Sequence, residues 1–243
     1  MSWRIGNRVF APRGWGIAVT ALLLAAFVSL GYWQIGRYHD KQAMVESFAA
    51  GDGTSVELGA QSVTALPRYQ HVRVRGVYDP SRQVLLDNMP SATGRPGYRV
   101  LTPLRRPGSE LLLMVDRGWV PLGATREDLP NVPVRPDERE VSGKLDELPA
   151  PGLRLGDAAA PGSAGWPRVL NFPTRPELEA VLGAPVEPRL LLLDAGAPDG
   201  FEREWRPAMR FGPERHLGYA IQWFALALAL TVIFVALSLQ RTP

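Results

Sequence analysis

Few side chains in this sequence could do chemistry, and its three histidines, His39, His71 and His216, are the first to consider. His39 follows Trp33 by six residues, and His216 precedes Trp223 by seven. If both tryptophans mark the same membrane interface, each imidazole stands about 10 Å beyond it along a helix. Two imidazoles at similar heights could ligate a metal or a haem iron. The alternative interpretation is a pair of solvated interfacial histidines.

Three cations lie near these two histidines in the sequence: Arg37, Lys41 and Arg215. They could meet carboxylates such as haem propionates. His71 stands instead in an alternating stretch, where an exposed or partly buried strand residue is expected. A Ser-His-Asp site would have to recruit one of the three histidines. The sequence shows no Gly-x-Ser-x-Gly elbow, Walker loop, dinucleotide glycine pattern or His-Glu-x-x-His.

Composition excludes further classes of site. The 243 residues include no cysteine, which rules out disulfides, thiol catalysis and cysteine-based metal sites. The net charge of +3 is mild and the basic residues are dispersed, so no nucleic-acid partner is expected. The 23 prolines and 24 glycines are scattered between apolar runs, a pattern typical of turn-rich β structure. Copper delivery is not favoured either, because cysteine and a methionine-rich cluster are both missing.

Two uncharged apolar stretches must position the histidines. Residues 217–239 carry no charge and, as a helix, would extend roughly 35 Å, enough to cross a hydrocarbon core. Residues 14–35 form a similar stretch that ends in the aromatic pair Tyr32-Trp33. A signal peptide is the competing interpretation of this first stretch. The stretch is longer than a signal-peptide core and no small-x-small cleavage site follows it, so a membrane anchor is predicted.

Charge around the first stretch predicts its orientation. Arg4, Arg8 and Arg13 precede it without any acidic residue, and the positive-inside rule then leaves the N-terminus in the cytoplasm. A second span returns the C-terminus, with Arg241, to the same side. We therefore expect a protein of the bacterial inner membrane with five parts: a cytoplasmic N-terminus at 1–13, spans at 14–35 and 216–239, a periplasmic β-rich domain at 36–215, and a cytoplasmic C-terminus at 240–243.

The part between the spans is predicted to be one mainly antiparallel β domain, a sandwich or a barrel, which makes the chain an α+β membrane protein. Residues 36–50 keep a helical spacing and should extend the first membrane helix until Gly51 and Gly53 end it. Strands are expected around residues 72–78, 83–87, 98–104, 110–120, 138–145, 169–172 and 188–194.

One short helix and one long loop complete this domain. Thr174 and Glu177 have the spacing of a capping box, which predicts a helix over residues 176–182 that Gly183 closes. Residues 149–166 are dominated by proline and small side chains, so a loose loop is expected there.

Four motifs resemble the surfeit-locus-one family of cytochrome c oxidase assembly factors, and they occur in that family's order from one end of the chain to the other. They are YWQ at residues 32–34 followed by Arg37 and Lys41, PGYRVLTPL at 96–104, VDRGWVP at 115–121 and HLGYAIQWF at 216–224. The resemblance implies a non-enzymatic protein with two membrane helices that hold one outward-facing domain. Asp116 departs from the Asn that the family often has before Arg-Gly-Trp.

The resemblance also implies a cargo. Such proteins assist the insertion of haem a into oxidase subunit I, and the family's candidate iron ligand corresponds to His216. Haem a is apolar with two carboxylates, so a groove walled by Tyr219, Trp223 and Phe224 beside Trp33, with Arg37 at the interface, would suit it. The role of His39 rests on its spacing alone. Oxidase subunit I, haem a synthase and membrane lipid are the implied partners.

Two other functions compete with haem carriage. The protein could be a scaffold that stabilises an oxidase intermediate through protein contacts, without haem. It could instead be a membrane-anchored periplasmic hydrolase, although no nucleophile and base can be paired in the sequence. Loss of His216 separates the first two, because a scaffold would still support oxidase assembly without it.

Overall fold

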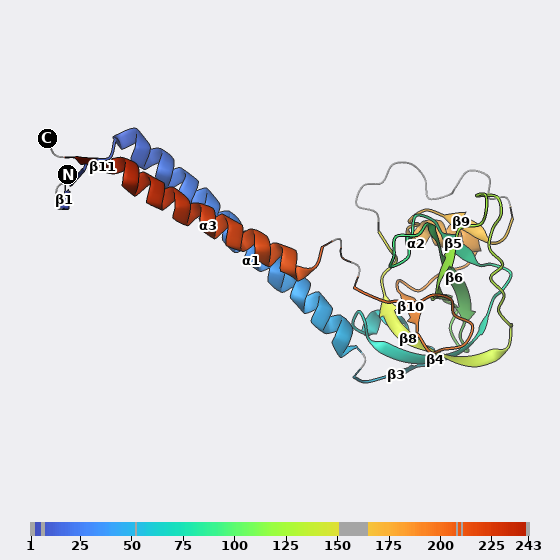
Figure 1. Cartoon of the computed structure of the whole chain (residues 1–243). Coiled ribbons are helices and arrows are strands. Elements are labelled where there is room, and N and C mark those ends of the chain that lie inside the picture. Colours follow the sequence, from blue (N-terminus) through green and yellow to red (C-terminus); the bar gives the residue numbers. More distant parts are fainter. Residues whose placement is uncertain are drawn as a thin grey trace. The chain divides into compact units, whose positions relative to one another are not determined.

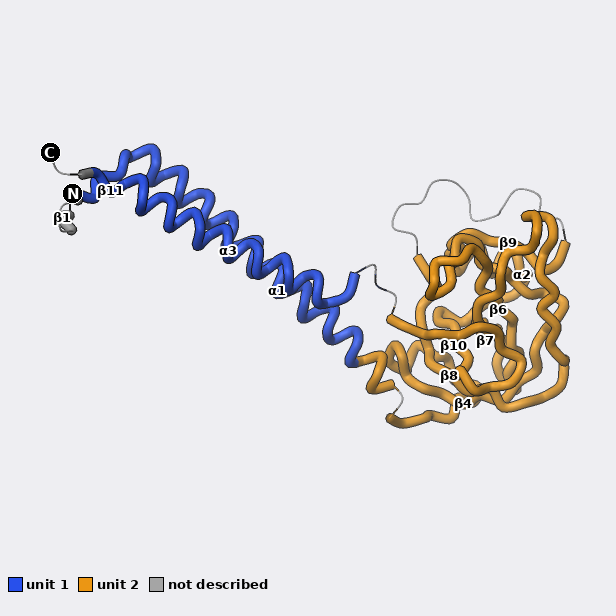
Figure 2. Tube along the Cα trace, in the orientation of Figure 1, with its two compact units in different colours: residues 1–46, 209–243 blue, residues 47–208 orange. Residues whose placement is uncertain are grey.

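The structure, a computed structural model, describes residues 3–5, 8–51, 53–150, 165–207, 209 and 211–241. The chain divides into two compact units, one formed by residues 1–46 with 209–243 and the other by residues 47–208 (Figure 2). The predicted loop at 149–166 lies outside the described residues apart from its two ends.

The first unit is built on two long helices that run side by side, α1 (Gly14–Ala50) and α3 (Pro213–Ser238) (Figure 1). Both are long and apolar enough to cross a membrane. Most of the apolar surface of each helix is exposed, which disfavours a water-soluble core helix and suits a lipid surrounding. The predicted extension of the first helix to residue 50 is confirmed, and the predicted α+β membrane class is confirmed with it.

Small residues line the seam between the two helices. Gly31 on α1 and Ala220 and Ala227 on α3 are buried there. Small residues let two helix backbones approach closely where lipid supplies no hydrophobic drive. A Cβ atom on Gly31 would lie 2.7 Å from the ring of Phe224, so a glycine at this position makes room for that ring.

A small antiparallel sheet joins the two ends of this unit. Strand β2 (Arg8–Phe10) lies between β1 (Trp3–Ile5) and β11 (Leu239–Arg241), with Phe10 opposite Leu239. These terminal strands were not predicted, because three-residue segments carry too little periodicity to be recognised. The pairing holds the start of α1 beside the end of α3.

The second unit is a β domain with a closed five-stranded barrel. Its strands are β3 (Val56–Leu58), β4 (His71–Tyr78), β5 (Val84–Leu86), β6 (Gly97–Arg105), β7 (Leu113–Pro121), β8 (Glu138–Asp146), β9 (Arg168–Leu170) and β10 (Leu190–Leu193). The barrel order is β4-β8-β10-β7-β6, and it closes where Tyr78 of β4 pairs with Leu104 of β6. Strand β3 extends the sheet from β4, and β5 and β9 extend it from β6.

The seven predicted strands are confirmed, and the barrel alternative among the two predicted architectures is the one observed. Five of the eight pairings in the domain are antiparallel. Strand β10 lies between β8 and β7 and runs parallel to β7, a crossover that alternation along the chain does not reveal. Strand β3 was not predicted.

The domain has a core on each side of strand β10. Leu191 and Leu193 pack inside the barrel with residues from its other four strands. Leu190 and Leu192 pack outside it against α2 (Arg175–Leu182). Burial on both faces explains why this strand is a continuous run of leucines. The predicted capping box at the start of α2 and the closing Gly183 are both confirmed.

One buried carboxylate next to the barrel should make the domain sensitive to acid. Asp79 accepts hydrogen bonds from the Ser81 hydroxyl and from the guanidinium groups of Arg82 and Arg105. Burial opposes ionisation of Asp79, but these hydrogen bonds outweigh it and lower its pKa to about 2. The stabilisation is present above the unfolded-state pKa of 3.8 and is lost as the pH falls towards 2.

We therefore expect the Asp79→Asn variant to unfold more easily than the wild type at pH 7, by about 1–2 kcal/mol. The difference should shrink steadily between pH 4 and pH 2. Urea unfolding of the full chain in detergent, repeated at several pH values, measures it. A difference that stays constant across this range would contradict the assignment.

Candidate functional site

The β domain contains a Ser, an Asp and a His in contact, but in the wrong order for a hydrolase. His71 Nε2 lies 2.9 Å from a carboxylate oxygen of Asp194, and the Ser142 hydroxyl donates to the same carboxylate at 2.6 Å. In a nucleophilic triad the imidazole lies between the hydroxyl and the carboxylate, where it accepts the proton. Here the carboxylate lies between the other two, so His71 cannot act as the base for Ser142. The arrangement ties β4 and β8 to the residue that follows β10.

Arg117, in the third motif, is a structural residue rather than a binding one. Its side chain is 1% exposed and donates hydrogen bonds to the carbonyl oxygens of Val132, Pro133 and Asp199. Burial lowers the pKa of Arg117. Its guanidinium also bonds the Gln83 amide oxygen at 3.0 Å. These bonds use the guanidinium donors inside the domain, so none is left to bind a ligand.

Asp116, the position that departs from the family, is also accounted for by internal contacts. Its side chain is fully buried, accepts the Gly118 backbone N–H at 3.0 Å and forms an ion pair with Arg99. The Arg99 guanidinium covers the ring of Trp205 at 5.0 Å. Burial raises the pKa of Asp116. The motif therefore stabilises the β domain, and the other predicted site residues lie in the helical unit.

The helical unit holds His216 in a defined orientation. His216 is half-buried in the first turn of α3, and its Nδ1 atom lies 2.8 Å from Oε1 of Gln34 on α1. Gln34 is buried in the seam between the helices. An amide oxygen can only accept, so the Nδ1 atom must carry the proton. When the ring is neutral, the lone pair is therefore on Nε2.

This arrangement matches the way proteins prepare a histidine to bind a metal. A ligating imidazole usually donates its other N–H to a fixed acceptor, which sets the ring's tautomer and orientation. In the described part of the chain, His216 Nε2 has no hydrogen-bond partner. His216 can therefore supply one nitrogen ligand to an iron or another metal from outside the protein.

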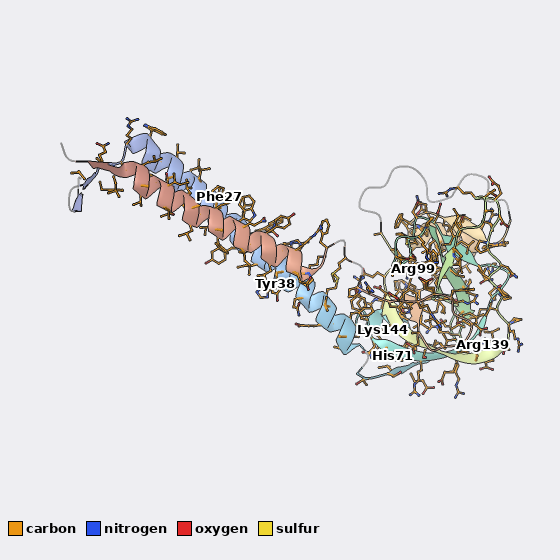
Figure 3. The ribbon with its side chains drawn as sticks, in the orientation of Figure 1. Phe27, Tyr38, His71, Arg99, Arg139 and Lys144 are labelled. Atoms are coloured by element: carbon orange, nitrogen blue, oxygen red, sulfur yellow. The ribbon has the colours of Figure 1, made fainter. Side chains whose placement is uncertain are left out.

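Aromatic rings line the seam beside this histidine. The ring centre of Trp223 lies 5.7 Å from that of Phe27, and Phe224 meets Tyr32 edge to face at 5.6 Å. Phe27 is labelled in Figure 3. These pairs join α1 to α3 two turns of α3 beyond His216, and they make this part of the seam apolar and polarisable. Trp223, predicted as a site residue, is thus partly occupied by packing against Phe27.

Two other predicted residues present free aromatic surface. Trp33 is 57% exposed on α1, and Tyr219 is 48% exposed on α3. Tyr219 follows His216 by three residues, so both lie on neighbouring positions of one helix face. Each ring could cover a flat apolar ligand from its own helix.

The predicted cations stand near the same end of the helices. Arg37 pairs with Asp40 at 3.3 Å, and both side chains are largely exposed. Arg215 covers the ring of Phe211 at 4.3 Å. Lys41 is half-buried further along α1. An exposed pair such as Arg37 and Asp40 contributes little to stability, so Arg37 can exchange its partner for an incoming carboxylate.

His39 is not brought together with His216. It lies five residues beyond Gln34, which turns it about 140° around the helix from the residue that contacts His216. Its side chain is exposed and its ring packs against Tyr38 at 5.2 Å. Among the described residues, no group of three or more His, Asp or Glu side chains could hold a metal ion. His216 is therefore the better ligand of the two.

Gln34 lies in the first of the four motifs, but no role was predicted for it. No role was predicted for Phe27 either. A clue was available in the spacing of both helices. Gly31, Gln34 and Tyr38 follow each other at the helical repeat, as do His216, Ala220 and Trp223. Pairing these two stripes in antiparallel order brings Gln34 beside His216.

A model of the SURF1 family matches residues 21–228, which cover most of α1, the whole β domain and the first part of α3. Among curated proteins, a SURF1-like protein from Rickettsia conorii is 26% identical over 217 residues, covering 86% of this chain and 85% of the relative. The Surfeit locus protein 1 of Takifugu rubripes is 24% identical over 250 residues, covering 90% and 95%. A SURF1-like protein from Rickettsia felis is 28% identical over 102 residues, or 44% of its length.

Proposed function

This chain belongs to the SURF1 family, a family of cytochrome oxidase assembly factors, and from this premise we propose that it binds haem a and assists its insertion into oxidase subunit I. The family is one of assembly factors and not of catalysts, so haem a would be a cargo. His216 would hold the iron, and the aromatic side chains around it would contact the apolar porphyrin.

The hydrogen bond between His216 and Gln34 is the observation that carries this proposal. It fixes the protonated nitrogen of His216 and leaves Nε2 as a ligand atom, from two helices that also supply exposed aromatic surface. A single imidazole suits a carrier, because a cargo must be released and a second strong ligand would slow its release.

The surrounding side chains fit the rest of the cargo. Trp33 and Tyr219 expose large aromatic faces, which suit a flat apolar macrocycle. Arg37 and Arg215 could pair with its two carboxylates, since a guanidinium binds a carboxylate through two parallel hydrogen bonds. The groups needed for the iron, the ring and the acids are therefore all present in the helical unit.

We further propose the inner membrane of a bacterium as the site of action. Arg13 before α1 and Arg241 after α3 favour both termini in the cytoplasm, which sets His216 and the β domain on the periplasmic side. Oxidase subunit I would receive the haem there, and haem a synthase would be its source.

Replacing Gln34 with leucine tests the preparation of His216. Without the acceptor, the imidazole can rotate and change tautomer, so we expect haem a binding to weaken by about 10–100-fold. The exposed Gln222 on α3 offers a matched control, and Gln222→Leu should bind normally. Haem a titration of the detergent-purified proteins, followed by absorption, gives both affinities. Equal affinities for the two variants would contradict the role of Gln34.

Oxidase assembly in cells separates carriage from scaffolding. A strain without its own copy of this protein would be complemented with wild type, with His216→Ala or with His39→Ala. The proposal predicts haem a-containing oxidase with the wild type and with His39→Ala, and little with His216→Ala. Full assembly with His216→Ala would instead favour a haem-independent scaffold.

A further inference from the structure

A cavity lies in the helical unit, at the end where α1 begins and α3 ends. Its volume is about 450 Å3. The lining includes Arg13, Trp15 and Thr20 near the start of α1, and Phe234, Leu237 and Ser238 near the end of α3. Ser238 follows His216 by 22 residues on the same helix, a distance of about 33 Å. The cavity is therefore separate from the proposed haem site.

Two buried hydroxyl groups line this cavity without a partner. Thr20 is 8% exposed and Ser238 is 5% exposed. Neither hydroxyl forms a hydrogen bond within the described residues. Thr231 on α3 differs, because its hydroxyl donates to the carbonyl of Ala227 one turn earlier at 2.8 Å, as hydroxyl side chains in helices often do. Both side chains line the cavity, so each hydroxyl is free to donate into it. Gly16 lies beside Phe234, and Thr20 and Ser238 each lie four residues from that pair in opposite directions, so the two hydroxyls are about 12 Å apart along the helices. They suit a ligand with acceptor atoms at two depths.

The charge at the mouth of the cavity indicates the sign of that atom. Arg13 is exposed immediately before α1 and has no carboxylate within ion-pair distance among the described residues. The first turn of α1 contains no acidic residue, so the positive end of a long helix dipole is uncompensated there. A cation, a helix N-terminus and the Ser238 hydroxyl together favour a phosphate.

The remaining walls are apolar. Val19 on α1 and Leu230, Ile233, Phe234 and Leu237 on α3 line the cavity beside the polar groups. These apolar side chains offer no contact to a free inorganic ion, but they can pack against a hydrocarbon chain. Trp15 is 68% exposed at the same level, as expected for a ring at a membrane interface.

From these observations we infer that the cavity binds one anionic phospholipid. Its phosphate lies between Arg13 and the Ser238 hydroxyl, the Thr20 hydroxyl donates deeper in the cavity to an ester carbonyl of the lipid, and one acyl chain lies against Phe234 and Leu237. Because Arg13 and Trp15 lie at the start of α1 while Ser238 and Phe234 belong to α3, the bound lipid bridges the two helices. It thereby adds to the contact that the terminal sheet makes between them.

Native mass spectrometry of the full chain in mild detergent tests this inference. After delipidation, the protein would be titrated with dioleoyl phosphatidylglycerol, with dioleoyl phosphatidylcholine and with inorganic phosphate. We expect one phosphatidylglycerol per chain, bound at least about tenfold more tightly than phosphatidylcholine. Inorganic phosphate at millimolar concentration should fail to displace it.

Variants identify the groups involved. The double change Thr20→Val with Ser238→Ala keeps the shape of both side chains and should weaken phosphatidylglycerol binding about tenfold. The matched control is Thr231→Val, because the Thr231 hydroxyl donates to a carbonyl of its own helix. This variant should bind the lipid as the wild type does. Arg13→Gln should lose the preference for the anionic lipid and Arg13→Lys should keep it. Arg13 is exposed, so its replacement does not endanger folding.

Three results would overturn the inference. The first is equal binding of phosphatidylglycerol and phosphatidylcholine by the wild type. The second is an unchanged preference in both the hydroxyl and the Arg13→Gln variants. The third is displacement of the lipid by inorganic phosphate, which would indicate a small-anion site.

Discussion

Replacing Arg117 with methionine is expected to lower the free energy of unfolding of the β domain by about 3–5 kcal/mol. The guanidinium binds backbone carbonyls at Val132, Pro133 and Asp199, and it bonds Gln83 and Thr102 as well. Methionine fills a similar volume but leaves these buried acceptors unpaired. Each unpaired buried acceptor costs about 1–3 kcal/mol, although the costs are not additive.

Chemical denaturation of the full chain in detergent, followed by tryptophan fluorescence, measures this loss. Arg75→Met is a matched control, since Arg75 is exposed on β4, and it should change stability by less than about 0.5 kcal/mol. Arg117→Lys should fall between the two, because an ammonium keeps the charge but cannot reach all the acceptors. A loss below about 1 kcal/mol for Arg117→Met would show that the acceptors find other donors.

The second large effect concerns His216. We expect His216→Ala to lose haem a by more than the roughly 10–100-fold that outer-shell changes cost, because alanine offers no ligand atom at all. Imidazole added to the medium should restore binding to this variant, since the aromatic walls and the cations remain. His39→Ala should retain haem a without imidazole.

Absorption spectra of the three proteins, each with haem a and with increasing imidazole, measure the effect. Rescue of His216→Ala by imidazole would show that the lost group was a ligand and not a structural support. If His216→Ala bound haem a as the wild type does, the iron ligand would have to be another residue.

Sequence patterns could predict the elements of the β domain but not how they close. Alternation identified β4 as a strand because Val72 and Val74 face one side while Arg73 and Arg75 face the other. Nothing along the chain indicated that β10 would insert beside β7, because strand order depends on contacts between distant residues. Strand β3 is three residues long, too short to show a period.

The candidate site was predicted in part for a related reason. His216 and Trp223 stand out because of their residue types near an apolar stretch. Gln34 does not, because an uncharged residue near the end of an apolar run has no special meaning until its partner is known. The hydrogen bond to His216 supplies that meaning, and it depends on the register of two helices almost two hundred residues apart.

Arg117 shows that residue type alone does not separate a binding role from a structural one. A basic residue beside a tryptophan, in a motif shared with a family, suggests a binding surface. The structure uses both side chains internally, with Trp119 Nε1 donating to the Met89 carbonyl at 2.8 Å. Burial decides between the two interpretations, and the alternation of β7 gives no hint of it, because this strand is buried on both faces.

The central claim, that His216 holds a haem a cargo, is tested most directly by one absorption spectrum. The full chain would be produced in cells that make haem a in abundance and purified in mild detergent, with His216→Ala treated in parallel. The account predicts haem a bands that accompany the wild-type protein and are missing from the variant. A colourless wild-type protein from haem a-replete cells would contradict it.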